Sequence, residues 1–163
     1  MWEKMGCQTH FLGMFRGCNN LTLDAKGRMV MPTRYRERLQ ERCGGSLVVT
    51  VDRDRCLLIY PLPDWEEVER KLMRLPTEKP QTRQLQRMMI GHAADLELDG
   101  HGRILLPADL RQFASLDRDA VLVGQGLKFE LWDQARWVER RETWQAADGS
   151  PGESPADFDN LSL

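Results

Sequence analysis

The sequence lacks the long apolar run that a membrane-spanning helix needs, since no stretch approaches about 18 consecutive apolar residues. Its first residues carry one lysine before a short mixed stretch at positions 10–12, which is too weak for a secretory signal. Histidine is scarce, with 3 in 163 residues, and none forms a recognisable pattern with a serine or cysteine nucleophile. A Gly-Lys-Ser/Thr phosphate loop is also absent. These absences argue against a membrane protein, a secreted protein and an enzyme of the common classes.

The cysteines are too few and too widely separated to cross-link the fold through disulfides or zinc. Cys7, Cys18, Cys43 and Cys56 are widely separated and show no paired spacing of a zinc site or a disulfide scaffold. Cys7 and His10 have a metal-like spacing, but the second pair that a zinc site requires is missing. We therefore predict that the protein binds no metal and no cofactor, and the sequence shows no evident small-molecule site. We expect the protein to reside in a reducing cytoplasm.

Net charge is small, at −2, but it is unevenly divided along the chain. After Arg141 there are five acidic residues and no basic one, so the preceding part holds 23 basic and 20 acidic residues, a net charge of +3. Residues 14–63 hold nine basic and five acidic residues, whereas residues 94–137 hold five basic and eight acidic ones. This asymmetry predicts one basic working surface in the first part of the chain.

An internal repeat is the strongest feature of the sequence. Residues 23–32 return as residues 98–107, at an offset of 75. Further matches follow in the same order over some 45 residues, which indicates two copies of one structural unit. These matches are Arg36 with Arg111, residues 47–49 with residues 121–123, Tyr60 with Trp132, and Trp65 with Trp137.

Each copy has the same predicted plan. A strand ends at Leu23, a tight turn uses Gly27, and a second strand covers residues 28–31. Pro32 starts a short helix over residues 33–40, and strands follow at residues 47–51 and 56–60. A unit of four short strands cannot cover its own apolar face, so it needs either the second copy or another chain.

Helical segments separate and follow the copies. Asp64 is predicted as the N-cap of a helix that Pro76 ends, and a second helix reaches Gly91. The fold class is thus mainly β with short helices (α+β), in two tandem pseudo-symmetric units. The predicted divisions are an N-terminal extension (1–13), a first unit (14–63), a helical spacer (64–92), a second unit (93–137), a C-terminal helix (138–147) and a disordered acidic tail (148–163).

Two motifs carry a resemblance to known proteins. The pattern Asp-x-x-Gly-Arg, three apolar residues, Pro and a short helix occurs at residues 24–38 and 99–111. It resembles the AbrB family of swapped-hairpin DNA-binding proteins. Residues 14–137, including the segments 14–17 and 60–65, resemble the MraZ family closely. This resemblance implies β-barrel-like units in a homo-oligomeric ring. It also implies a regulator that binds double-stranded DNA at short direct repeats in the promoter of the division and cell-wall gene cluster.

Basic residues near the first turn are the candidate DNA contacts. Arginines and lysines bind phosphates, and an arginine fork also fits the O6 and N7 atoms of guanine. The resemblance implies that Arg28 and Arg36 contribute to DNA binding, with Arg103 and Arg111 as their counterparts. The complete candidate set is Lys26, Arg28, Arg34, Arg36, Arg38, Arg103 and Arg111.

The second copy departs from the basic pattern. It has Asp109 where the first has Arg34, and Phe113 where the first has Arg38. A basic residue that AbrB-type proteins carry just before the aspartate is replaced by leucine in both copies, at Leu21 and Leu96. We therefore expect the first copy to make most of the DNA contact and the second mainly to assemble the ring.

Four turn residues are given structural roles. Gly27 and Gly102 are predicted to supply a positive φ, and Asp24 and Asp99 to cap the turns or pair with the arginine four residues later. Arg28 could on this basis be held by Asp24 without touching DNA. The competing function is a protein-interaction adaptor barrel, which would not need the salt-sensitive DNA affinity that phosphate contacts impose.

Overall fold

The computed structural model describes residues 14–147, and it confirms the predicted fold class. Antiparallel strands dominate, and strand–strand–helix–strand–strand–helix occurs twice. The predicted extension 1–13 and tail 148–163 lie outside the described residues. The first copy and spacer contain β1 (Phe15–Thr22), β2 (Arg28–Val30), α1 (Thr33–Cys43), β3 (Ser46–Val51), β4 (Leu57–Pro61), α2 (Leu62–Met73) and α3 (Pro80–Met89). The second copy contains β5 (Ala94–Glu97), β6 (Arg103–Leu105), α4 (Ala108–Phe113), β7 (Asp119–Gly126), β8 (Phe129–Asp133) and α5 (Gln134–Ala147).

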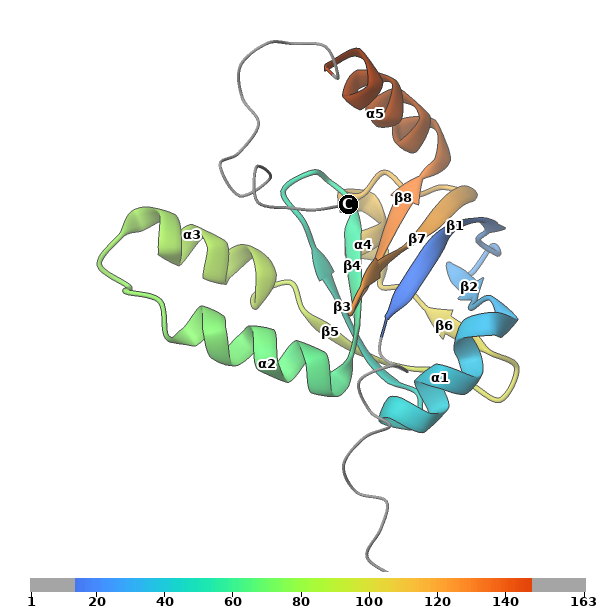
Figure 1. The fold of residues 1–163 in the computed structure, drawn as a ribbon, viewed down its shortest axis with the longest axis horizontal. Coiled ribbons are helices and arrows are strands. Elements are labelled where there is room, and N and C mark those ends of the chain that lie inside the picture. The colour runs from blue at the N-terminus through green and yellow to red at the C-terminus, as the bar shows by residue number, and fades with distance from the viewer. Residues whose placement is uncertain (1–13, 148–163) are drawn as a thin grey trace, which may run out of the picture.

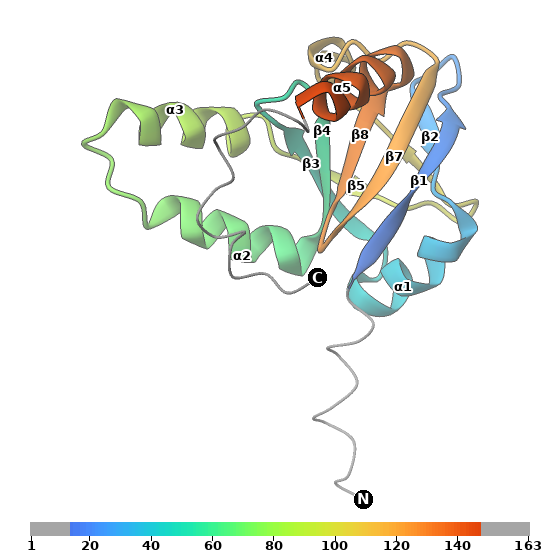
Figure 2. The same cartoon turned by 45° about the horizontal axis from the view of Figure 1, so that its top comes forward.

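The two copies exchange strands within one sheet. The order of the six-stranded sheet is β1-β7-β8-β4-β3-β5, and replacing every strand by its counterpart gives the same order in reverse. The first strand of each copy therefore pairs with the other copy, β1 with β7 and β5 with β3 (Figures 1 and 2). The apolar face of each unit is thus covered by the other unit of the same chain.

The strand register reveals a local two-fold axis. Leu58 of β4 lies opposite Glu130 of β8, and Met29 of β2 lies opposite Ile104 of β6. These pairs are separated by 72 and 75 residues, the two offsets of the sequence repeat. Equivalent residues face each other only on a symmetry axis, so the axis passes through both the large sheet and the small β2–β6 ribbon.

The central strands are buried on both faces. In β3 and β4, side chains alternate between an inner cluster, which includes Val49 and Ile59, and an outer cluster, which includes Val48 and Tyr60. This alternation follows from the period of two in a strand. Because both clusters are apolar, these strands read as continuous hydrophobic runs in the sequence.

The longer helices cover the outer cluster. Trp65 and Leu72 of α2 are buried there, and Leu85 and Met89 of α3 pack against it. The α2–α3 hairpin extends away from the sheets, while α5 lies across the ends of β7 and β8 (Figure 1). Among the described residues, none of the helices is both long and apolar enough to cross a membrane.

The prediction that Asp64 caps α2 is wrong. The helix begins at Leu62, two residues earlier, and within residues 14–147 no side chain caps it. Asp64 lies in its first turn and accepts two hydrogen bonds from Arg42 of α1, at 2.7 Å from Nε and 2.5 Å from Nη2. A proline is tolerated inside the first turn, so Pro63 does not delay the start, and the carboxylate instead links α1 to α2.

Candidate nucleic-acid interface

The first turn is held by the aspartate that begins it. Asp24 Oδ1 accepts hydrogen bonds from the backbone N–H groups of Lys26 (3.0 Å) and Arg28 (2.9 Å). Its Oδ2 pairs with Nε of Arg28 at 2.7 Å. Gly27 has a φ of 83°, a conformation that glycine adopts without the steric cost of a Cβ. Asp24 thus both caps the turn and orients Arg28.

The second turn repeats this arrangement. Asp99 Oδ1 accepts hydrogen bonds from the N–H groups of His101 (2.8 Å) and Arg103 (2.9 Å), and Oδ2 lies 2.9 Å from Nε of Arg103. Gly102 has a φ of 76°, and His101 is exposed. Two segments far apart in the chain therefore each contain one aspartate–arginine ion pair.

The hydrogen bonds lower the pKa of both aspartates. The backbone N–H of Arg103 is the largest cause for Asp99, followed in the same direction by the N–H of His101 and the Arg103 side chain, and the pKa falls to about 2. The pKa of Asp24 is lowered by the equivalent N–H of Arg28, then by its guanidinium and the N–H of Lys26. Hydrogen bonds to a carboxylate favour its charged form.

We expect Asp99 to remain mostly ionised at pH 3, which NMR titration of its side-chain carboxyl carbon would measure. Because its pKa in the folded protein lies below the ordinary 3.8, its contribution to stability is complete above that value and is lost as pH falls toward 2. In Arg103→Ala the pKa should rise only in part, since both backbone N–H groups remain. A wild-type titration midpoint near 4 would contradict this geometry.

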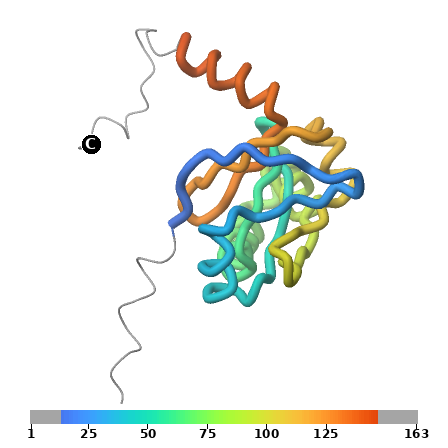
Figure 3. Tube along the Cα trace, turned by 90° about the vertical axis from the view of Figure 1, so that its right-hand side faces the viewer, coloured from blue at the N-terminus to red at the C-terminus, as the bar shows by residue number. Residues whose placement is uncertain are grey.

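The β2–β6 ribbon brings the two aspartate–arginine ion pairs side by side. Met29 and Ile104, at its centre, are 0% and 1% exposed and face the core. The flanking positions point outward, where Arg28 lies opposite Leu105 and Val30 lies opposite Arg103. Val30 and Leu105 are 47% and 56% exposed. The ribbon lies at the right of the molecule in Figure 1 and faces the viewer in Figure 3.

Two exposed aliphatic residues of this surface, Val30 and Leu105, are not among the candidate site residues. The sequence pattern predicts only that they belong to apolar strands. The signal was available, because side chains alternate in a strand and a buried Met29 places both of its neighbours on the outer face. The outward face is therefore mixed, with two arginines and two aliphatic side chains.

Arg36 and Arg111 lie at the glycine of the opposite unit. The Arg36 guanidinium occupies the space that a Cβ on Gly102 would fill, and Arg111 does the same at Gly27. Nε of Arg36 donates to the carbonyl of Met31 (2.7 Å), and Nε of Arg111 donates to that of Leu106 (3.2 Å). Both arginines are partly buried, so the structure brings them to the turns rather than extending them into solvent.

Arg34 and Arg38 contact the edge of the large sheet. Arg38 donates to the carbonyl of Met14 (3.1 Å), and Arg34 donates to Oδ1 of Asn19 (2.6 Å) while lying 4.7 Å from the centre of the Tyr35 ring. Both are nonetheless exposed. These contacts are specific to the first copy, because Asp109 and Phe113 stand at the equivalent places in the second. Phe113 instead packs against the inner cluster.

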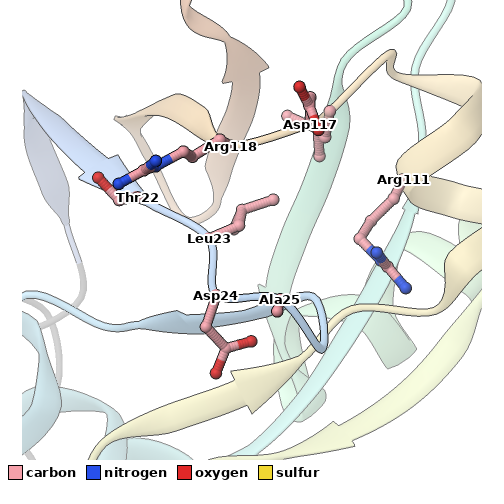
Figure 4. Close-up of a pocket in the computed structure, with 8 residues that line it drawn as sticks. Thr22, Leu23, Asp24, Ala25, Arg111, Asp117 and Arg118 are labelled. Atoms are coloured by element: carbon pink, nitrogen blue, oxygen red, sulfur yellow. The ribbon is translucent and has the colours of Figure 1, made fainter.

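An open hollow of about 620 Å³ lies beside the first turn. Its walls come from the end of β1, the first turn, α4 and the segment before β7 (Figure 4). Arg111 projects into it toward the first turn, so the hollow is the space around that contact. The lining residues are Thr22, Leu23, Asp24, Ala25, Arg111, Leu116, Asp117 and Arg118.

Within residues 14–147, no three histidine, cysteine or acidic side chains are grouped so that they could share a metal ion. The one metal-like spacing in the sequence, at Cys7 and His10, lies outside the described residues. Cys56 is buried, and burial raises the pKa of its thiol, followed by the nearby acidic residues. A thiol that stays protonated is a poor nucleophile.

The fold and the paired turns define the class of protein as a tandem swapped-hairpin β protein. A family model described as "MraZ protein, putative antitoxin-like" matches residues 14–88 and again residues 89–153. The chain belongs to the MraZ family.

Relatives cover nearly the whole chain. A protein of Thioalkalivibrio sulfidiphilus named "Transcriptional regulator MraZ" is 57% identical over 150 residues, which are 92% of this chain and all of that protein. Proteins with the same name from Pseudomonas aeruginosa and Methylococcus capsulatus are 53% and 59% identical, over 151 and 131 residues. They cover 92% and 80% of this chain, and 100% and 86% of their own lengths.

Proposed function

We propose that this protein is a transcriptional regulator that binds double-stranded DNA sequence-specifically through the outer face of the β2–β6 ribbon. The observation that carries the proposal is the pair of aspartate-oriented arginines, Arg28 and Arg103, on one two-stranded ribbon. The shared name of the relatives supports the regulatory part of the proposal. Such a regulator acts in the cytoplasm, at the nucleoid.

The shape of the ribbon suits the major groove of DNA. That groove is about 12 Å wide and admits a two-stranded β-ribbon. The Asp24 carboxylate takes its hydrogen bond from Nε of Arg28, so it does not occupy the two terminal nitrogens of the guanidinium. Those nitrogens form the fork that grips O6 and N7 of guanine or a phosphate.

The other ribbon residues complete a mixed contact. Val30 and Leu105 are suited to the apolar methyl group of thymine, while the exposed Lys26 is placed for a phosphate contact. Arg34 and Arg38, exposed on α1, add positive charge on the side of the first copy. We therefore propose that the first copy makes most of the contact.

A homo-oligomeric ring would supply the affinity that a single ribbon lacks. Each ribbon strand is three residues long, so one subunit makes few contacts. Several ribbons on repeated boxes gain affinity through effective concentration, and boxes about 10 base pairs apart present the same groove to successive subunits. We propose that the boxes are short direct repeats in the promoter of the division and cell-wall gene cluster, as the family resemblance implies.

The test is fluorescence anisotropy with a duplex from upstream of the protein's own gene and a scrambled duplex. Arg28→Ala is expected to weaken specific binding about 10- to 100-fold and to reduce the slope of log affinity against log salt. Arg70→Ala is the matched control, because Arg70 also pairs with a nearby acid, Glu67 at 2.8 Å, but lies on the projecting α2.

Arg70→Ala should bind like the wild type, and both variants should melt at the wild-type temperature. Equal and weak binding of wild type to both duplexes, unchanged by Arg28→Ala, would refute the proposal. The adaptor alternative would then account for the fold, since a protein-interaction barrel requires no affinity for DNA.

A further inference from the structure

The two glycine turns are tied to each other across the repeat. The N–H of Met31 donates to the carbonyl of Gly102 (2.7 Å), and the N–H of Leu106 donates to that of Gly27 (3.1 Å). Each turn is therefore fixed by the strand end of the other unit. These cross-unit hydrogen bonds, which anchor each turn, therefore set the position of its Asp–Arg pair.

Arg36 completes the anchor of the second turn. Its Nε binds the carbonyl of Met31, the same residue whose N–H holds Gly102. Its guanidinium then covers Gly102 on the side where any other residue would carry a Cβ. The second turn thus lies against a strand end and a planar side chain that both belong to the first unit.

Arg111 makes the equivalent contact at the first turn. It binds the carbonyl of Leu106, whose N–H holds Gly27, and it covers Gly27 in the same way. The two contacts are related by the local two-fold axis. A planar, always charged guanidinium can lie flat on a glycine and donate sideways to a carbonyl, which a lysine ammonium cannot do.

We infer that Arg36 and Arg111 are positioning residues that act across the repeat, Arg36 on Arg103 and Arg111 on Arg28. Arg103 directly follows Gly102, and Arg28 directly follows Gly27. Each covered glycine therefore sets the direction of a ribbon arginine. All four of these arginines belong to the candidate set of direct DNA contacts, and the inference gives Arg36 and Arg111 a positioning role instead. It rests on the proposed function of the ribbon.

A double-mutant cycle separates positioning from direct contact. Arg36→Ala is expected to weaken DNA binding about 10-fold in the wild-type and Arg28→Ala backgrounds, and to have little effect in the Arg103→Ala background. Arg111→Ala should show the reverse pattern, losing its effect in the Arg28→Ala background. Effects that multiply in both backgrounds would overturn the inference, because direct contacts at separate sites are additive.

The conservative variant gives an independent readout. Arg36→Lys keeps the positive charge, so it should restore binding if Arg36 contacts phosphate and should fail to restore it if the planar group must cover Gly102. In Arg36→Ala the slope of log affinity against log salt should fall by no more than it falls in Arg103→Ala, and replacing both arginines should lower it no further. Rescue by lysine, or a slope that falls by a further amount of about 1 when both arginines are replaced, would overturn the inference.

A measurement without DNA tests the contact separately from the proposed function. In ¹H–¹⁵N spectra, Arg36→Lys should shift the Gly102 and Arg103 amides and speed hydrogen exchange of the Met31 N–H. The Gly27 and Arg28 amides of the other turn serve as the internal control and should change much less. Unchanged Gly102 and Arg103 amides would overturn the inference even if the protein binds DNA. If these shifts are present but the wild-type protein does not bind the native duplex specifically, the result would instead count against the proposed function.

Discussion

Separate production of the two halves, residues 1–77 and 78–163, is expected to give two chains that do not fold as monomers. The cut falls in the exposed connection between α2 and α3. Each half would lose the strand partners that the other supplies, β7 for β1 and β8 for β4, and would expose its share of one common core. Circular dichroism should show no cooperative unfolding for either half alone, and an equimolar mixture should recover the β spectrum and the melt.

The matched control is the complete chain cleaved at the same connection after folding, which should stay associated and retain its melting curve. Sedimentation of the isolated halves provides the decisive comparison. A half that is monomeric and melts cooperatively would contradict the strand exchange. Self-pairing of one half into a dimer would support it, because β3 would then replace its counterpart β7 beside β1.

Phe129→Ala is expected to remove about 3–5 kcal/mol from the free energy of unfolding. Phe129, on β8 of the second copy, is 0% exposed. Its ring centre lies 4.3 Å from that of Phe15 and 4.9 Å from that of Tyr35, both in the first copy. Truncation leaves a cavity at the junction of the two copies, and a loss of this size is a large part of the roughly 5–15 kcal/mol that stabilises a typical domain.

Urea denaturation followed by circular dichroism would measure the Phe129→Ala loss. Leu127→Ala, two residues away at a position that is 45% exposed, is the matched control and should change stability by less than about 0.5 kcal/mol. A loss below about 1 kcal/mol for Phe129→Ala, with an unchanged dependence on urea, would contradict the packing described for this junction.

The repeat and its turns could be predicted from the sequence because their signals are local. Residues 24–28 contain the whole first turn, since the aspartate binds N–H groups two and four residues later. A glycine at the turn position predicts the positive φ. The failure at Asp64 has the opposite origin, because its partner Arg42 lies 22 residues away and nothing near Asp64 in the sequence indicates it.

The candidate arginines show where sequence reasoning ends. Arg34 and Arg38 share a helix face, as their spacing predicts, but their contacts with Asn19 and Met14 depend on where β1 lies. Arg36 is an arginine on the same helix as Arg34 and Arg38, yet its guanidinium lies on the glycine turn of the other copy. The direction of a long arginine side chain is set by the surfaces around it.

The sequence by itself determined that the chain contains two copies of one β-rich unit and that each copy has an Asp–Gly–Arg turn. It could do so because periodic burial and turn hydrogen bonds join residues that are close in the chain. Only the tertiary structure decided that the copies exchange strands, that Val30 and Leu105 share an outer face with the two turn arginines, and that each glycine turn is held by the opposite unit. Those contacts join residues distant in the chain, and the packing of both copies around one common core brings them together.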